Sequence, residues 1–392
     1  MLYNILHVIP YFAPAWGFGG PVRISWDLAK KSSSVGHKVT VFTTTISDGK
    51  TKEFASGEEF INNIRVVRFP NDNNWAASQK IWNPKGLSEQ LNKEIKQFDL
   101  ICLHEYRTLL NVQVSKLALQ NKTPYFLFAY GTIPRGDGWK VLAKFLFDKC
   151  WGYKMIKNAN RVFAQTTNEK SEYRKSGVSP QKISMFPLMV NLDEFKILPT
   201  KKYAREKFNF SQKDFVILFL GRLHKYKGIE LIIRAVEGLK NKIPNLKLLI
   251  VGNDEGYLPI IKQVIKKKNL GAFIKISPPL YEKERLFAYC ASDLFVLTPY
   301  FYEETSLAAL EALACGIPVI VTKQAEIPHL VQYHAGYIIK HDEDILIENI
   351  NYFYENKKHM HFWSLNAKKL IKQKYNLGHL YYQFEQYIQS IL

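Results

Sequence analysis

Cysteine is scarce in this sequence. The 392 residues include four cysteines, and no two of them have the close spacing of a zinc site or a redox motif. A reduced compartment is the simplest explanation for cysteines scattered in this way.

Long apolar runs are missing as well. No run approaches the length of a membrane-spanning helix, and the N-terminal segment MLYNILHVIP lacks the basic region and the cleavage site of a signal peptide. We therefore expect a cytoplasmic protein that is soluble or peripheral on the inner face of a membrane.

Acidic residues are outnumbered by basic ones. The chain has 35 Asp and Glu against 54 Lys and Arg, a formal net charge of +19. Such an excess attracts nucleic acid, anionic lipid or phosphorylated ligands, although a well-solvated lysine-rich surface has the same composition. Because no zinc-finger, basic-zipper or RNA-binding signature is present, we expect no nucleic-acid partner.

Metal-binding motifs are also missing. No H-E-x-x-H occurs, and Asp342-Glu343-Asp344, formally a D-x-D, directly precedes an apparent helix that begins at Ile345. An acidic start of a helix explains that segment better than a metal site does. We predict that no metal ion is required.

The sequence does contain a repeated alternation of strands and helices. Helix-period segments such as 22–35 and 111–120 lie between several apolar, β-branched runs, which are residues 5–9, 39–44, 64–69, 100–103, 125–129 and 162–165. This alternation predicts an α/β fold with a parallel sheet covered by helices on both faces.

The same pattern begins again after a charged, linker-like stretch at 193–213. Helices are expected at about 227–240, 259–268 and 307–314, between strands at 215–220, 246–251, 274–277, 294–298 and 319–322. We predict two Rossmann-like, doubly wound domains, residues 1–195 and 196–374, with a helix at about 375–392 that packs back on the first. Facing each other, they would enclose a central cleft.

The first motif that carries chemistry is FLGRLHKYKG at 219–228. A buried strand ends at Gly221, which permits a tight turn, and Arg222 and Lys227 follow it. A bidentate guanidinium, an ammonium and the N-terminus of the next helix are together suited to a diphosphate. Two exposed cations beside a strand end would give the same pattern.

The second motif is EETSLAALEALACGIPVI at 303–320. Ser306 or Thr305 can cap a helix that Gly316 and Pro318 end. The uncapped N–H groups of Thr305, Ser306 and Leu307 can hold a phosphate oxygen.

Two carboxylates lie in this second motif, with seven residues between them. Glu303 precedes the helix and can accept hydrogen bonds from sugar hydroxyls, although complementing the helix dipole would also explain it. Glu311 lies in a strongly apolar helix, where a carboxylate is either partnered or functional. The paired hydroxyls of a ribose would satisfy it.

The third motif is the glycine-rich loop PYFAPAWGFGGPVR at 10–23, directly after the first strand. Gly19 and Gly20 stand before a helix that Pro21 can open, so the backbone can approach a phosphate or a sugar closely. Val22 occupies the place of the third glycine of the dinucleotide fingerprint, and no G-K-[ST] follows, so neither nucleotide-binding signature is present.

In this order and spacing, the three motifs resemble a retaining glycosyltransferase of family 4 with the two-domain GT-B fold. The resemblance covers nearly the whole chain, including GHKVTVFT at 36–43 and NLDEF at 191–195. It implies these contacts: Arg222 and Lys227 with the donor diphosphate, Glu311 with the ribose, Glu303 near the donor sugar, and Gly19 and Gly20 beside the donor phosphate. Glu304-Thr305-Ser306 replace the family's frequent Gly-Phe-Gly, which alters the sugar pocket.

Candidates in the first domain are fewer. His104 ends a predicted strand, where a family member often has a His facing the donor sugar, although a structural or surface His is equally expected there. Glu105 and Arg107 are near enough to tune or replace it. Arg135, on a loop after another strand end, is a candidate contact for an anionic acceptor.

One segment suggests a membrane. Residues 139–161 contain six Lys or Arg and one acid, Asp148, interleaved with large apolar residues. This composition is typical of a helix on an anionic membrane surface. A domain helix with its aromatic side on the sheet and its lysines in solvent would have the same composition.

The function that the resemblance implies is a metal-independent, hexosyltransferase-type glycosyltransferase. It would move a sugar from a nucleotide-diphosphate sugar, UDP- or GDP-linked, to a glycan or lipid-linked acceptor, with retention and without a cofactor. The alternatives are a sugar-nucleotide epimerase or a glucan phosphorylase of similar shape, or a non-catalytic nucleotide-binding protein that docks on membranes.

Overall fold

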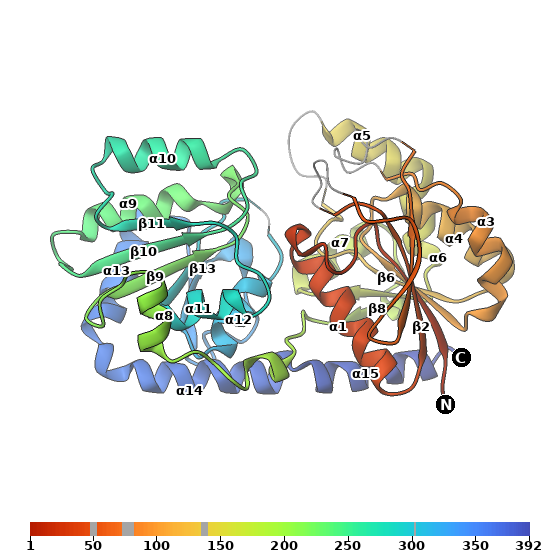
Figure 1. Ribbon diagram of the computed structural model, residues 1–392. Helices are drawn as coiled ribbons and strands as arrows, with labels where there is room; N and C mark the ends of the chain where they lie inside the picture. The colour runs from red at the N-terminus through yellow and green to blue at the C-terminus, as the bar shows by residue number, and fades with distance from the viewer. Residues whose placement is uncertain (48–52, 73–81, 135–139, 302) are drawn as a thin grey trace. The chain divides into compact units, whose positions relative to one another are not determined.

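The apolar runs of the sequence form two parallel sheets, each of which lies in its own compact unit. The computed structural model describes residues 1–47, 53–72, 82–134, 140–301 and 303–392. Unit 1 comprises residues 1–189 with 377–392, and unit 2 comprises residues 190–376 (Figure 1). The predicted α/β fold with two doubly wound parallel-sheet domains is confirmed.

The sheet of unit 1 has eight strands in the order β3-β4-β2-β1-β5-β6-β7-β8, all parallel except β3 against β4. The strands are β1 (Asn4–Val8), β2 (Lys38–Thr44), β3 (Gly57–Ile61), β4 (Ile64–Phe69), β5 (Leu100–His104), β6 (Tyr125–Phe128), β7 (Arg161–Ala164) and β8 (Ile183–Met185). Strands β1, β2 and β5 are buried almost throughout, as parallel strands covered on both faces are.

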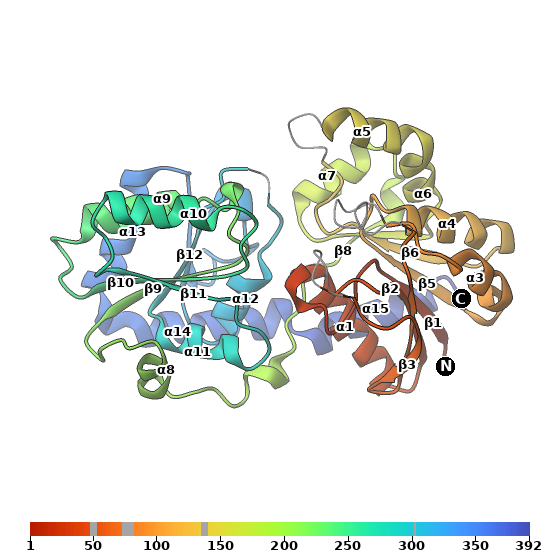
Figure 2. The ribbon, with the colours of Figure 1, turned by 45° about the horizontal axis from the view of Figure 1, so that its top comes forward.

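Helices cover both faces of this sheet. One face is covered by α1 (Gly20–Ser34) together with the C-terminal helix α15 (Leu377–Gln389), which contact each other. The other helices that the structure describes in unit 1 are α3 (Leu87–Glu94), α4 (Leu109–Asn121), α5 (Lys140–Phe147), α6 (Tyr153–Asn158) and α7 (Thr167–Lys175). Figure 2 shows α5 at the edge of unit 1, from where a short π-helix, η3 (Asp148–Gly152), leads into α6.

Unit 2 contains a six-stranded parallel sheet in the order β11-β10-β9-β12-β13-β14. The strands are β9 (Phe215–Leu220), β10 (Leu246–Val251), β11 (Ile274–Ser277), β12 (Leu294–Leu297), β13 (Val319–Thr322) and β14 (Gly336–Ile339). The five strands expected in this half match β9 to β13 to within one residue at either end, because each is a short apolar run bounded by polar residues, whereas β14 was not predicted.

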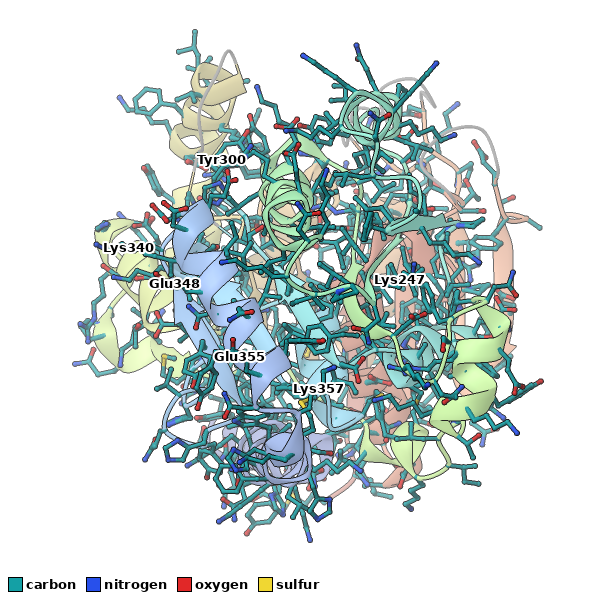
Figure 3. All side chains as sticks on the ribbon, turned by 90° about the vertical axis from the view of Figure 1, so that its left-hand side faces the viewer. Lys247, Tyr300, Lys340, Glu348, Glu355 and Lys357 are labelled. Carbon is teal, nitrogen blue, oxygen red and sulfur yellow. The ribbon has the colours of Figure 1, made fainter. Side chains whose placement is uncertain are left out.

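The helices of unit 2 form a layer on each face of the sheet (Figure 1). One layer contains α9 (Ile229–Leu239), α10 (Leu258–Lys267) and α13 (Glu343–Glu355); the other contains α8 (Lys201–Lys207), α11 (Glu284–Ala291), α12 (Leu307–Ala314) and α14 (Met360–Leu370). Glu348 and Glu355 lie on the exposed side of α13 (Figure 3), as expected for an amphipathic helix that covers a sheet.

The expectation that residues 193–213 form a linker is wrong, because helix α8 lies in this stretch. Thr200 caps it by accepting a hydrogen bond from the Tyr203 N–H. Its Arg205 is buried and donates to the Asp293 carboxylate at 2.7 Å. The charges that suggested a linker therefore include a buried ion pair whose partner lies far along the chain.

The two segments by which the chain passes between the units lie side by side. The Val190 N–H donates to the Tyr375 carbonyl at 2.7 Å, and Val190 pairs with Asn376 as an isolated bridge. The chain thus enters unit 2 near residue 190, slightly before the expected boundary at 195.

Candidate functional site

The polar residues of the second-half motifs lie at the carboxyl ends of β9 and β12, where ligands bind in open α/β sheets. The backbone is tightly packed there. A Cβ on Gly228 would lie 1.7 Å from the Thr298 carbonyl oxygen, and one on Gly252 would lie 1.7 Å from the Gly221 carbonyl oxygen. Only glycine permits these approaches, which hold the loops after β9, β10 and β12 together.

Lys227 and Glu303, 76 residues apart in sequence, form an ion pair. Lys227 Nζ donates to Glu303 Oε1 at 2.5 Å, and the side chains are 11% and 25% exposed, respectively. Lys227 ends the 3₁₀ turn η6 (Lys225–Lys227), and Glu303 is held by its N–H, which donates to the Gln324 carbonyl. The structure thus brings together two candidates that the sequence placed in separate motifs.

Arg222 has a different partner. Its Nη1 donates to both carboxylate oxygens of Glu255, on the loop after β10, at 3.0 and 2.9 Å. The Arg222 side chain is 41% exposed, so its guanidinium remains accessible to a ligand. Glu255 was not singled out from the sequence, because its proximity depends on the parallel pairing of β9 and β10.

The start of α12 is organised as expected. Ser306 is the capping residue, accepting a hydrogen bond from the Ala309 N–H, and the Thr305 hydroxyl donates to the Glu326 carbonyl instead. Helix α12 therefore begins at Leu307, and the N–H groups of its first turn follow the loop that carries Glu303.

Glu311 is partnered. It is 7% exposed, and its Oε2 accepts hydrogen bonds from Arg285 Nε and from the Tyr289 hydroxyl, each at 2.9 Å. Neither partner was predicted, because both lie on α11, a helix that the sequence pattern did not indicate. Their spacing of four residues puts both on one face of that helix and was the available signal.

The glycine loop of unit 1 forms the start of α1. Gly19 is the residue before this helix, with a φ of +82°, and Gly20 is its first residue. A Cβ at either position would have no heavy atom within 4 Å among the described residues. Gly19 is therefore required by its backbone conformation, and no described residue fills the space beside either glycine.

His104 ends β5 but is fully buried. Its Nε2 is hydrogen-bonded to His7 Nδ1 at 2.9 Å and its Nδ1 to the Tyr130 hydroxyl at 2.6 Å, and the ring is stacked against Phe128. Burial, and then the neighbouring His7, holds the pKa of His104 well below its usual value, so the ring is neutral.

Arg107 and Glu105 lie near His104 in the sequence, and Arg107 joins two parts of unit 1. Arg107 donates to Asp148 through Nε and Nη2, both at 2.9 Å, and to the carbonyls of Thr132 and Ile133. It thus joins the loop after β6 to the π-helix η3. Glu105 has a φ of +71° at the end of the strand. Arg135 lies outside the described residues.

The acidic segment at 342–344 is the start of a helix, as predicted. The Asp342 carboxylate accepts a hydrogen bond from the Ile345 N–H and caps α13. Across the described ranges, no group of three or more His, Cys, Asp or Glu side chains is arranged to hold a metal ion.

Curated proteins provide two comparisons. A D-inositol 3-phosphate glycosyltransferase of Kineococcus radiotolerans is 27% identical over 176 residues, 43% of this chain and 40% of that protein. The corresponding protein of Rhodococcus jostii is 28% identical over 335 residues, 80% of this chain and 72% of that protein. The match to the first covers less than half of its length.

Solved structures share the fold. The Anabaena protein Alr3699/HepE in complex with UDP superposes with a TM-score of 0.79 at 16% identity, over 99% of this chain and all of that one. Residues 18–194 match the family described as Glycosyltransferase Family 4, and residues 200–370 match Glycosyl transferases group 1. With the GT-B architecture of two parallel-sheet α/β units, this chain belongs to the group 1 glycosyltransferases of family 4.

Proposed function

We propose that the protein is a retaining, metal-independent glycosyltransferase that uses a nucleotide-diphosphate sugar as its donor. The acceptor in this proposal is a glycan or a lipid-linked sugar. Family membership supports glycosyl transfer over the epimerase alternative, and the Anabaena relative was solved with UDP, which supports a nucleotide donor.

The observation that carries the proposal is the Lys227–Glu303 pair beside the first turn of α12. An ammonium, a carboxylate and a helix N-terminus converge at the end of one sheet, and the guanidinium of Arg222 follows the same strand, β9. A diphosphate needs positive groups, and a sugar hydroxyl needs an acceptor such as Glu303. We assign Arg222, Lys227 and the N–H groups of residues 305–307 to binding of the diphosphate. At Gly19 and Gly20, in this proposal, the backbone approaches a phosphate or a sugar closely.

The proposed chemistry is stabilisation of the departing nucleotide diphosphate. The cations and helix N–H groups lower the barrier because they are already oriented toward the charge that develops on the leaving phosphate. Attack by the acceptor hydroxyl on the same face, with its proton passing to that phosphate oxygen, accounts for retention without an enzyme nucleophile. A double displacement through Glu303 is the second route. His104 is assigned no substrate contact, because its ring is buried.

The first test is a thermal-shift screen with UDP, GDP and ADP and their sugars, with and without EDTA. A ligand that binds the native state raises its apparent stability, so one nucleotide should raise Tm selectively and EDTA should not change the shift. Lys227→Ala and Arg222→Ala should each reduce it, whereas Arg234→Ala, which removes an exposed ion pair with Glu343 in the same unit, should not. Absence of a shift with every nucleotide would contradict the assigned donor site.

The second test measures turnover with the selected nucleotide sugar. We expect Arg222→Ala to lower kcat by about 100-fold or more, because the transition state loses a charge-stabilising group. NMR of the product should show that the anomeric configuration is retained. Full activity of the Arg222→Ala protein would contradict the assigned diphosphate contact.

We also propose that the protein docks on an anionic membrane through helix α5. No described side chain of this helix, residues 141–147, is buried, and Leu142, Leu146 and the nearby Trp151 are 66%, 52% and 46% exposed. Lys149 and Lys154 are exposed beside them. The inward contacts of the segment come instead from Asp148, Met155 and Ile156, which are buried.

These exposures favour the membrane interpretation of residues 139–161 over a helix packed on the sheet. Apolar side chains flanked by lysines match the surface of an anionic bilayer, where both burial and charge attraction contribute. The described residues include no helix that is both long and apolar enough to span a bilayer. Attachment in this proposal is therefore at the surface.

Vesicle co-sedimentation tests the docking. Wild-type protein should pellet with phosphatidylcholine vesicles that contain phosphatidylglycerol, and less at high salt because screening weakens the attraction. The double variant Leu142→Ser/Leu146→Ser should lose most of this binding, whereas Ile197→Ser, at an even more exposed apolar site in unit 2, should keep it. Equal binding by both variants would reject α5 as the docking helix.

A further inference from the structure

Arg285 lies between two carboxylates that come from distant parts of the chain. Its Nε donates to Glu311 Oε2 at 2.9 Å and its Nη2 to Glu194 Oε2 at 2.7 Å. Arg285 and Glu311 are 8% and 7% exposed, whereas the Glu194 side chain is 27% exposed. A buried cation that joins two carboxylates is a built feature of unit 2, and the contacts assigned above to the donor do not include it.

Tyr289 completes the arrangement. One turn along α11 from Arg285, its hydroxyl donates to the same atom, Glu311 Oε2, at 2.9 Å. Burial, reinforced by the charge of Glu311, raises the pKa of Tyr289 well above its usual value, so the phenol remains a donor. Burial alone would lower the pKa of Arg285, but the charges and hydrogen bonds of Glu311 and Glu194 outweigh it and raise that pKa.

The contacts are distributed unevenly over the Glu311 carboxylate. Both hydrogen bonds that the described side chains donate to it end on Oε2. Among the described residues both donors bind Oε2, so Oε1 can accept hydrogen bonds from a ligand. Two fixed donors on one oxygen also define the plane of the carboxylate, so the direction of Oε1 is set before a ligand arrives.

Glu194 adds a link to the chain crossing. It lies in the 3₁₀ turn η5 (Leu192–Phe195), just after the chain enters unit 2 at Val190. The Arg285 guanidinium also lies 5.9 Å from the Phe195 ring. The segment that begins unit 2 therefore holds Arg285, and Arg285 in turn holds Glu311.

We propose that Arg285 is a positioning residue for recognition of the donor ribose. Through Glu311 Oε2 it orients the carboxylate so that Oε1 accepts hydrogen bonds from the ribose hydroxyls, with Tyr289 as the second support and Glu194 holding Arg285. This inference rests on the proposed function together with the ribose contact of Glu311 that the resemblance to family 4 implies. A buried ion pair is by itself weak evidence of a stabilising role, so a purely structural purpose needs a separate test.

Discrimination between ribose and deoxyribose provides that test. Titration calorimetry would compare UDP with 2′-deoxy-UDP, or the same pair for GDP or ADP if the thermal screen selects that base. The wild-type protein should bind the ribonucleotide about 10-fold or more tightly, because a hydrogen bond to an ionised group is lost in the analogue. The ratio of the two dissociation constants is the readout, since a general loss of stability does not change it.

The variants separate the contributions. Arg285→Gln should bring the ratio close to one, Arg285→Lys should restore part of it, and Tyr289→Phe and Glu194→Gln should lower it to intermediate values. Arg234→Gln, whose exposed pair with Glu343 lies elsewhere in unit 2, is the matched control and should keep the wild-type ratio. If Arg285→Gln fails to fold, the ratios of dissociation constants for the isosteric Tyr289→Phe and the more exposed Glu194→Gln test the positioning role instead.

Each outcome has one meaning. A wild-type ratio near one would overturn both the Glu311 ribose contact and the positioning role, while nucleotide binding and its dependence on Lys227 would still stand. A high wild-type ratio that persists in folded Arg285→Gln and Tyr289→Phe proteins would overturn the positioning role alone. No shift with any nucleotide in the screen would remove the proposed function and this inference together.

Discussion

Glu169 is a buried carboxylate in the first turn of α7. Its Oε1 accepts a hydrogen bond from the Gly131 N–H at 2.7 Å and its Oε2 one from the Gln165 N–H at 2.8 Å, so it ties the loop after β6 to the end of β7. Burial raises the pKa of Glu169 to about 7, although the two backbone hydrogen bonds oppose the rise.

Glu169 should make stability depend on pH. Because its pKa is higher in the folded state, the native protein binds more protons than the unfolded chain between about pH 4.5 and 7. The contribution of Glu169 to the free energy of unfolding is therefore complete below this window. It falls as pH rises through the window, by at most about 3 kcal/mol. Urea unfolding at a series of pH values measures this slope.

Glu169→Gln should remove most of that slope, because the group no longer titrates. Glu172→Gln on the same helix is the control; its carboxylate is paired with Lys175 at the surface, and the slope should remain. An unchanged slope in the Glu169→Gln protein would show that another group titrates in this range.

Individual residues differed in how far the sequence could place them. Ser306 was one of two predicted caps, and residues 342–344, of which Asp342 is the cap, were predicted as the acidic start of a helix, because a helix start depends on neighbours about three residues away. His104 was placed correctly at a strand end, but its burial depends on His7 and Tyr130, which lie in other strands and loops. A local pattern indicates where a residue lies along the chain and not what covers it.

At the scale of elements, the turn from β9 into α9 shows how closely two loops must pack. Gly228 has a φ of +70°, and its Cα faces the Thr298 carbonyl oxygen at the end of β12. The Thr298 hydroxyl also donates to the Gly228 carbonyl at 2.9 Å. This contact holds Lys227 beside the loop that carries Glu303.

Gly228→Ala should destabilise the protein by at least about 3 kcal/mol and weaken the thermal shift with nucleotide. The added Cβ would lie 1.7 Å from a backbone oxygen, so one loop must move, in addition to the strain of a positive φ. Urea unfolding and the thermal-shift screen report the two effects.

Gly256→Ala is the matched control. Gly256 has a φ of +90°, but a Cβ added there would have no heavy atom within 4 Å among the described residues, so only the conformational strain, about 1–2 kcal/mol, applies. Similar losses at the two glycines would show that steric contact with Thr298 does not matter.

Elements with a clear period were predictable, and short or charged ones were not. Strands β4, β9, β10, β11 and β13 and helix α12 begin and end where the sequence pattern predicts them. Helices α8 and α11 were missed because Arg205 and Arg285, which are buried, interrupt the apolar pattern. A buried arginine needs carboxylate partners, and the partners of Arg205 and Arg285 are distant in sequence. The local pattern therefore gives no reason to place either arginine on the buried side of a helix.

At the scale of the molecule, unit 1 is completed by the last residues of the chain. Phe384 of α15 is fully buried and contacts the rings of Phe126, Phe128, Phe163 and Phe186, from the strands β6 and β7 and the segment after β8. The His37 ring also lies 3.4 Å from the Glu385 carboxylate. Helix α15 therefore belongs to the core of unit 1.

Phe384→Ala should destabilise unit 1 by about 3–5 kcal/mol, because it removes a large buried ring and leaves a cavity. Tyr382→Ala on the same helix removes a side chain that is 62% exposed and should change stability by about 0.5 kcal/mol or less. Unfolding followed by circular dichroism compares the two, and equal effects would argue against α15 as part of the core of unit 1.

The sequence by itself determined the α/β class, most strands, the start of α12 and the family, because these depend on short-range periodicity and on motifs with fixed spacing. Tertiary structure alone decided which charges meet. The Lys227–Glu303, Arg222–Glu255 and Arg285–Glu311 pairs join segments that are 26 to 76 residues apart. Parallel strands connected by helices bring such segments to one edge of a sheet, and no local pattern of residues contains that information.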